Sequence, residues 1–215
     1  MEDRAIDRPD PALLVQMLLA RVREDGLQAL SWGEGATRLR HRIAFLRGLA
    51  PDAWPDVSDA ALLAALDSWL APMLEGRTAL AQVSADALEQ AIRDLVPWDM
   101  QRRLDAEAPE RFTVPTGSNL LIDYAAEGGP RLEVRVQELF GLAQHPTIAG
   151  GRSPLTLSLL SPARRPVQVT RDLPGFWSGS WKAVRSEMRG RYPRHPWPEN
   201  PLEAPPTTRV KPRGT

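Results

Sequence analysis

The chain has 215 residues, of which 42% are hydrophobic and 25% are charged, a composition typical of a soluble globular protein that excludes a disordered or fibrous class. It has no cysteine, which excludes disulfides and thiolate metal sites and fits a reducing compartment. The N-terminal MEDRAIDRPD has no secretory-signal pattern, and no apolar run approaches the roughly 18 residues of a membrane span. We therefore expect a cytoplasmic protein that does not enter a membrane.

The formal net charge of zero conceals a strong asymmetry along the chain. Residues 1–151 carry 15 arginines and 23 acidic residues, whereas residues 152–215 carry 12 basic and 4 acidic residues. Such segregation indicates either that the basic end meets a polyanion or that the two halves attract each other. The sequence leaves both readings open.

The first half is predicted to be a succession of helices. Caps, prolines and apolar stripes mark five of them. They run from Pro11 to Gly26, over about 33–48, from Ser58 to before Pro72, from Ser84 to Pro97, and from Pro97 to before Pro109. Val83 and Leu88 flank the Ser84 cap as a hydrophobic staple. We predict a helical lobe over residues 1–110.

The periodicity changes after about residue 111. Residues 131–137 alternate apolar and polar side chains, which indicates a half-buried strand. Similar strand patterns cover 119–125, 154–160 and 165–170, and the EGGP sequence at 127–130 provides glycines for a hairpin turn. We predict a small antiparallel sheet of about four strands, and hence an α+β fold.

One more helix is predicted between Asp172 and Gly190. Its apolar residues recur at helical spacing and line one face: Trp177, Trp181, Val184 and Met188. The YPRHPWPENP sequence that follows should form a semi-rigid strap, because proline fixes φ and extends the residue before it. Tyr192 and Trp197 are expected to anchor this strap. The second domain is predicted over 111–200, with an extended or flexible proline-rich tail over 201–215.

No motif for independent chemistry is present. The sequence has neither a phosphate-binding P-loop nor a dinucleotide-binding glycine motif. The three histidines lie far apart and give little support for zinc: His41, His145 and His195. Three carboxylates on or near the strands could be brought together for acid–base work: Asp123, Glu133 and Glu138. Glu133 is expected on the solvent face of its strand and catalytic use of the three is disfavoured, so we predict no catalytic residue, metal or cofactor in this chain.

The latter half resembles a known family in several consecutive blocks. RVQELFGLAQHPTIAGGRSPLTLSLLSPARRPVQVTRDLPGFW at 135–177 and EMRGRYPRHPWPENPLEAPPTTRVKPRG at 187–214 resemble the C-terminal region of the HrpB family of bacterial DEAH-box ATP-dependent helicases. The LSWGEGATRLRHRIAFLR stretch at 30–47 is similar to the segment that follows the motor and an OB-like domain in those proteins. Family members commonly have lysine where this sequence has Arg194, which preserves the charge.

The resemblance implies a piece of a larger enzyme. In the family, the ATPase and helicase motifs belong to two RecA-like domains that would lie upstream, so ATP and Mg²⁺ are expected at that motor and not here. The upstream helicase core is an expected partner. The resemblance also implies that the parent protein acts on RNA or a related nucleic acid.

The basic residues of the last predicted helix and the strap are the candidates for nucleic-acid contact. They are Lys182, Arg185, Arg189, Arg191 and Arg194, and the tail adds Arg209, Lys211 and Arg213. Neutralising phosphates would release counterions, but a solvated helix face or packing against the acidic lobe is the alternative. Base stacking by Trp177 and Trp181 is disfavoured against a core role. A core role is also expected for the tryptophans of the helical lobe: Trp32, Trp54, Trp69 and Trp98.

Two functions remain open on these residues. The first is an accessory domain of an HrpB-like RNA helicase that assists binding of single-stranded RNA or another nucleic acid. The alternative is a protein-interaction or scaffold module that docks on the helicase core or recruits a partner. An independent hydrolase is disfavoured because no hydrolase motif is present.

Overall fold

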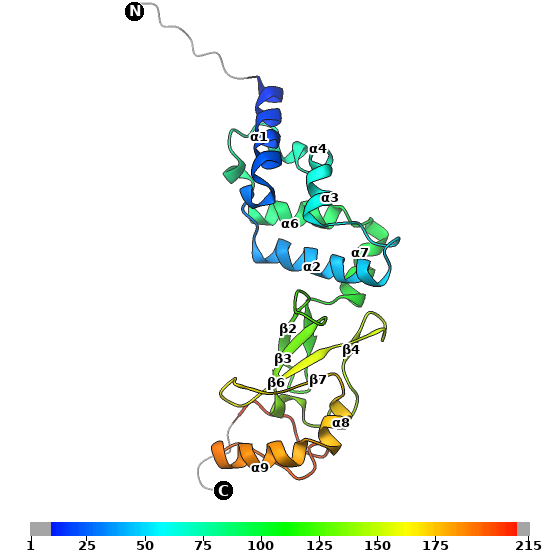
Figure 1. Cartoon of the computed structure of the whole chain (residues 1–215), viewed down its shortest axis with the longest axis vertical. Helices are drawn as coiled ribbons and strands as arrows, with labels where there is room; N and C mark the ends of the chain where they lie inside the picture. The colour runs from blue at the N-terminus through cyan, green and yellow to red at the C-terminus, as the bar shows by residue number, and fades with distance from the viewer. Residues whose placement is uncertain (1–9, 210–215) are drawn as a thin grey trace, which may run out of the picture. The chain divides into compact units, whose positions relative to one another are not determined.

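The computed structural model describes residues 10–209, and the chain divides after Leu104 into two compact units (Figure 1). The first unit is helical, and the second carries the sheet together with the last two helices. Within residues 10–209, no helix is both long and apolar enough to cross a bilayer. The first nine residues and the last six, which belong to the predicted ranges 1–110 and 201–215, lie outside the described part.

The first unit contains the predicted helices, the last of which continues past Leu104, and two short 3₁₀ turns. In chain order these are α1 (Pro11–Asp25), η1 (Leu27–Ala29), α2 (Glu34–Leu49), α3 (Asp59–Ala64), α4 (Leu66–Trp69), α5 (Ala71–Leu74), η2 (Leu80–Gln82), α6 (Ala85–Asp94) and α7 (Trp98–Glu107). The predicted caps are confirmed, because Asp10, Ser58 and Ser84 each accept a hydrogen bond from a backbone N–H in the first helical turn.

The predicted single helix from Ser58 to Pro72 is wrong, since the chain forms α3, α4 and α5 there. Both the hydroxyl and the backbone N–H of Ser68 donate to the carbonyl of Ala65, at 2.7 and 2.9 Å, which tightens the chain at the first break. At the second break Pro72 has no N–H to give to a helical hydrogen bond, and its ring collides with the preceding turn of a continuous helix. Proline in the first turn of α5 avoids that conflict.

Part of the predicted stripe of α1 faces solvent. Leu19 and Val22 are fully buried, whereas Leu13 and Met17 are 55% and 60% exposed. The apolar side chains of this helix are spread around its axis, but the rest of the unit covers only the side that carries Leu19 and Val22. Only part of the apolar stripe that marks this helix in the sequence therefore contributes to the core.

The sheet of the second unit is mixed. Its strands are β1 (Arg111–Thr113), β2 (Asn119–Asp123), β3 (Arg131–Arg135), β6 (Thr156–Leu160) and β7 (Pro166–Thr170), in the spatial order β1-β2-β3-β6-β7. A separate short hairpin joins β4 (Thr147–Ile148) to β5 (Ser153–Pro154).

The predicted all-antiparallel pairing is wrong at one position, because β3 and β6 run parallel with Leu132 opposite Leu157. Parallel neighbours need a crossover of about a dozen residues or more, and the segment 136–155 supplies it. Its first part, η3 (Val136–Leu139), ends β3 two residues earlier than predicted. Every residue of β6 is buried, as expected for a central strand covered on both faces.

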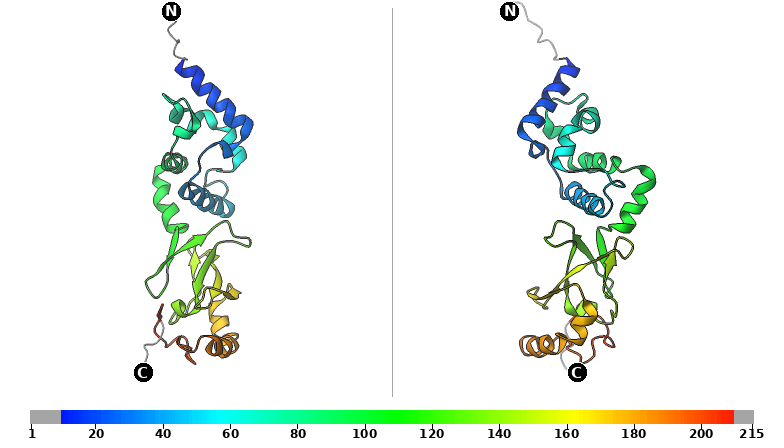
Figure 2. Two further views of the ribbon diagram at one scale, coloured as in Figure 1. Left: turned by 90° about the vertical axis from the view of Figure 1, so that its left-hand side faces the viewer. Right: turned by 45° about the vertical axis from the view of Figure 1, so that its right-hand side comes forward.

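The last predicted helix is two helices, α8 (Leu173–Ser178) and α9 (Trp181–Arg191). The break lies at Gly179, where φ is −103° and ψ is −85°. A Cβ at this glycine would lie 2.9 Å from the carbonyl oxygen of Gly175, so only glycine fits without movement. The chain after α9 then folds back beside that helix, which all views show (Figures 1 and 2).

The tryptophans mostly take the core positions expected of them. Trp177 and Trp181 are buried in the second unit, and Trp54 and Trp69 are buried in the first. The core prediction is wrong for Trp98, which is 79% exposed at the first residue of α7. It follows a proline and belongs to no apolar stripe, because Leu104 is the buried residue of that helix.

Candidate nucleic-acid interface

The basic candidates are positioned by an aromatic cluster centred on Trp181. Its ring centroid lies 5.7 Å from that of Phe140, 5.5 Å from Trp177 and 6.1 Å from Trp197. Aromatic pairs at these separations stabilise packing beyond their buried area. Phe140 follows η3, Trp177 belongs to α8 and Trp197 belongs to the strap. Contacts of Trp181 with these three residues therefore fix α9 to the rest of the second unit.

Hydrogen bonds hold the strap against α9. The indole N–H of Trp181 donates to the carbonyl of Pro198 at 3.2 Å, and that of Trp197 donates to the carbonyl of Tyr192 at 2.8 Å. Arg185 Nε donates to the carbonyl of Trp197 at 3.0 Å. The predicted strap and its anchor Trp197 are confirmed, because the segment is non-helical and this tryptophan is buried.

Two of the five basic candidates already have partners within the chain. Arg185 forms an ion pair with Glu199 at 3.0 Å in addition to its bond to the strap. Arg191 pairs with Glu187, one helical turn earlier on α9, at 3.3 Å. Arg185 is therefore a structural residue of the strap, which the sequence stripe does not distinguish from its neighbours.

The other three candidates, Lys182, Arg189 and Arg194, are exposed. Within residues 10–209 their side chains form no ion pair or hydrogen bond. Lys182 and Arg189 are seven residues apart on α9, so they share a face and lie about 10 Å apart along the axis. Of the tail cations, Arg209 is exposed, while Lys211 and Arg213 lie beyond the described residues.

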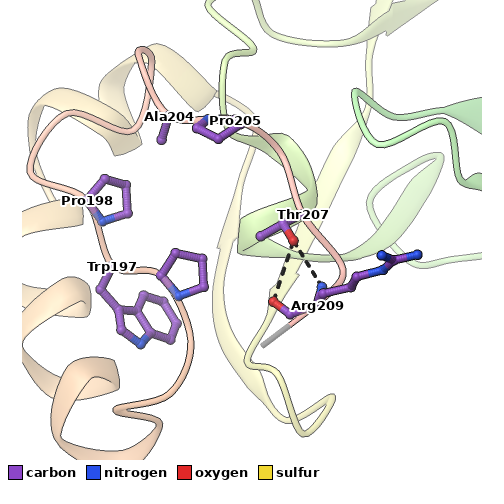
Figure 3. Close-up of a pocket in the computed structure, with 7 residues that line it drawn as sticks. Trp197, Pro198, Ala204, Pro205, Thr207 and Arg209 are labelled. Atoms are coloured by element: carbon purple, nitrogen blue, oxygen red, sulfur yellow. Dashed lines mark hydrogen bonds between the residues drawn. The ribbon is translucent and has the colours of Figure 1, made fainter. Parts of the chain in front are cut away.

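A hollow of about 420 Å³ opens beside the strap (Figure 3). Among the described residues its lining is mostly apolar: Pro196, Trp197, Pro198, Ala204, Pro205, Thr207 and Arg209. The hydroxyl of Thr207 accepts the backbone N–H of Arg209 at 3.0 Å, so it is engaged locally. These walls offer ring faces and one guanidinium, which suit binding and not acid–base chemistry.

The strap also carries His195, whose surroundings are positive. Partial burial lowers the pKa of His195 below its ordinary 6.5, and the charges of Arg135 and Arg194 lower it further. The ring of Tyr192 lies edge-on to the imidazole at 6.2 Å between centroids. Burial and the two nearby arginines therefore both oppose protonation of His195.

The remaining titratable candidates show no catalytic arrangement. Glu138 is buried and accepts bonds from Arg135 at 2.8 Å and Thr116 at 3.2 Å. His145 accepts the N–H of Leu173 at Nδ1, at 3.1 Å, and Nε2 lies 2.8 Å from the carbonyl of Leu155, so its role is to join segments. Asp123 and Glu133 are exposed. Over residues 10–209, no three His, Asp or Glu side chains gather as a metal site would require.

Sequence reasoning missed two exposed arginines, Arg164 and Arg165, in the turn between β6 and β7. The signal that could have drawn attention to them is the SPARRP sequence, which places two cations inside a tight turn. Both lie near the strap, because Ser161 of the same turn contacts Tyr192, with 3.4 Å between their hydroxyl oxygens.

Comparison with known proteins connects this chain to helicases. Residues 69–201 match a family model described as the ATP-dependent helicase C-terminal region of HrpB. The chain is 47% identical to the ATP-dependent RNA helicase HrpB of Escherichia coli over 205 residues, covering 95% of this chain and 25% of that protein. The chain thus spans about a quarter of the length of this relative.

Two solved structures share the fold. The crystal structure of the E. coli DExH-box NTPase HrpB superimposes with a TM-score of 0.84 at 45% identity, covering 95% of this chain and 26% of the other. A crystal structure of the E. coli DEAH/RHA helicase HrpB gives a TM-score of 0.72 at 44% identity, covering 89% of this chain and 24% of the other.

Proposed function

Since the chain belongs to the HrpB family of ATP-dependent helicases and matches its C-terminal region, we propose that it assists RNA binding beside the helicase motor. The observation that supports this most is the set of exposed cations on α9 and the strap that no acidic residue neutralises within residues 10–209. The motor itself, with its ATP and Mg²⁺, belongs in this proposal to the upstream part of the helicase.

The local charge balance favours a polyanion. Residues 155–209 contain nine basic and four acidic residues. Three of the four acids are engaged, because Asp172 caps α8 while Glu187 and Glu199 form ion pairs. A cationic surface remains, and single-stranded RNA is the polyanion that the RNA helicase relative makes relevant.

Phosphate contacts by these residues predict a measurable salt dependence. For a single strand, log K falls against log salt by about 0.7 for each phosphate neutralised, because bound counterions are released. Contacts by Lys182, Arg189 and Arg194 alone would give a slope of about −2.

The test is binding of the whole chain to a fluorescein-labelled oligouridylate, followed by anisotropy between about 50 and 200 mM salt. The variant Lys182→Gln with Arg189→Gln should bind more weakly and reduce the slope by about 1.4. Arg185 is left intact because its loss would loosen the strap. The matched control is Arg102→Gln with Arg171→Gln, two exposed arginines that belong to neither α9 nor the strap, which should bind as the unaltered chain does. Equal loss in both variants, or no loss in either, rejects the α9 surface.

A docking function has its own support. Trp98 is 79% exposed, and Leu13 and Met17 add exposed apolar area in the same unit. Large exposed aromatic residues are common anchors at protein interfaces. This alternative predicts no RNA affinity at physiological salt, with measurable association between this chain and the separately expressed motor domains that Trp98→Ala weakens.

A further inference from the structure

The turn between β6 and β7 holds an arginine in a backbone conformation that suits glycine. The carbonyl of Ser161 accepts the N–H of Arg164 at 2.9 Å, and the N–H of Ser161 donates to the carbonyl of Arg165 at 2.8 Å. Arg164 has φ of +59°, in the left-handed region. This is the three-residue hairpin loop that ends in a left-handed bulge residue, a position usually taken by glycine.

A long side chain at this position carries a conformational cost. Non-glycine residues with positive φ are uncommon, and Asn and Asp tolerate the region better than arginine does. Backbone outliers of this kind persist where the surrounding structure fixes them, and they cluster at ligand-binding and other functional sites. The side chain of Arg164 is exposed and forms no ion pair or hydrogen bond with residues 10–209, so its guanidinium is accessible to a ligand.

The turn lies against the strap. Ser161 and Tyr192 approach to 3.4 Å between hydroxyl oxygens, and Pro162 of the turn lines the same narrow crevice as His195 and Arg135. The tip of the β6–β7 hairpin and the end of α9 lie on the same side of the second unit in Figure 1. The exposed cations Arg164 and Arg165 are thereby placed on a segment adjoining the one that carries Arg194.

We propose that the β6–β7 turn and the strap form one phosphate-binding edge, in which Arg164, Arg165 and Arg194 contact the backbone of single-stranded RNA. This inference rests on the proposed RNA-binding function and adds a second segment to its surface. Guanidinium groups suit this role, because each can present two parallel donors to the oxygens of a phosphate.

The charge around this edge is one-sided. Residues 161–170 contain two arginines and no acidic residue, and residues 192–198 contain one arginine and no acidic residue. Burial contributes most to the lowered pKa of His195, and the charges of Arg135 and Arg194 lower it further, so positive charge also lies close to this histidine. A bound phosphate placed there would favour the protonated imidazole and raise that pKa.

The test uses Arg164→Gly with Arg165→Gln in the whole chain, with the labelled oligouridylate as probe. Glycine suits the left-handed conformation, so the unfolding temperature should hold or rise while RNA affinity falls by at least about threefold and the salt slope by about 1.4. A loss of affinity without loss of stability separates a binding role from a structural one. A second variant, Arg164→Asn with Arg165→Gln, checks the result with another residue that tolerates this conformation.

The outcomes separate this inference from the proposed function. As a control, Arg171 lies at the end of β7 that is far from the turn, and Arg171→Gln should leave the RNA affinity unchanged. If the unaltered chain binds RNA and the turn variants bind equally well, the edge is wrong while the proposed function stands. If the unaltered chain binds no RNA but associates with the motor domains in a manner that needs Arg164, both are wrong and the edge contacts protein.

Discussion

Replacing Arg185 by glutamine should destabilise the second unit and change RNA binding little. Arg185 is one of three basic residues in a stripe on α9, yet it differs from Lys182 and Arg189 in its contacts. Its Nε donates to the carbonyl of Trp197 at 3.0 Å, and its terminal nitrogen meets Glu199 at 3.0 Å. These two bonds connect the helix to the strap.

The magnitude follows from how exposed each partner is. The Arg185 side chain is 24% exposed, so its charged hydrogen bond to a main-chain carbonyl contributes about 1–2 kcal/mol to the free energy of unfolding. The Glu199 side chain is 87% exposed, and an ion pair with so exposed a partner adds no more than about 0.5 kcal/mol. Arg185→Gln should therefore cost several times more than Glu199→Gln.

Thermal unfolding followed by tryptophan fluorescence measures the difference, because Trp177, Trp181 and Trp197 all belong to the affected unit. For a unit of this size, each kcal/mol moves the midpoint by about 4–8 °C. Equal small shifts for both variants, or a large loss of RNA affinity for Arg185→Gln at temperatures where it stays folded, would refute the structural role.

Three further predictions concern other parts of the fold. Gly179→Ala should destabilise the junction of α8 and α9 by about 1–2 kcal/mol, since its Cβ would press on the Gly175 carbonyl, and denaturant unfolding measures this. Because the pKa of His195 is lowered on folding, its contribution to stability is complete above about pH 6.5 and is lost as pH falls through the folded-state pKa. An NMR titration should show that Arg194→Gln raises this pKa without reaching 6.5, since burial remains; an unchanged pKa would contradict the assigned cause. Trp98→Ala should alter the free energy of unfolding by less than about 0.5 kcal/mol, because the side chain is exposed, and a larger change in the unfolding midpoint would show hidden packing.

Local signals in the sequence predicted local structure well. Ser84 and its neighbours start α6 as expected because an N-cap and a staple act within one turn of helix. The prolines after Arg191 predicted the strap for the same reason, since they restrict only their own and the preceding residue. The parallel pairing of β3 with β6 was missed, because it depends on a crossover whose path no short pattern encodes.

In the candidate site too, the local placement of residues was predicted and their long-range contacts were not. The sequence placed Lys182, Arg185 and Arg189 on one helix, which the structure confirms. It could not show that Arg185 is engaged by Glu199, because these residues are 14 positions apart and meet only after the strap folds back. Arg164 was missed because its importance depends on a left-handed turn conformation that becomes visible only in three dimensions.

The most direct test of the central claim is the salt dependence of RNA binding by the unaltered chain. If the exposed cations of α9, the strap and the β6–β7 turn contact phosphates, log K for the labelled oligouridylate should fall linearly against log salt with a slope between about −2 and −3.5. Absence of binding at about 50 mM salt, or an affinity that does not change up to about 200 mM, would contradict the claim that this surface binds a nucleic-acid backbone.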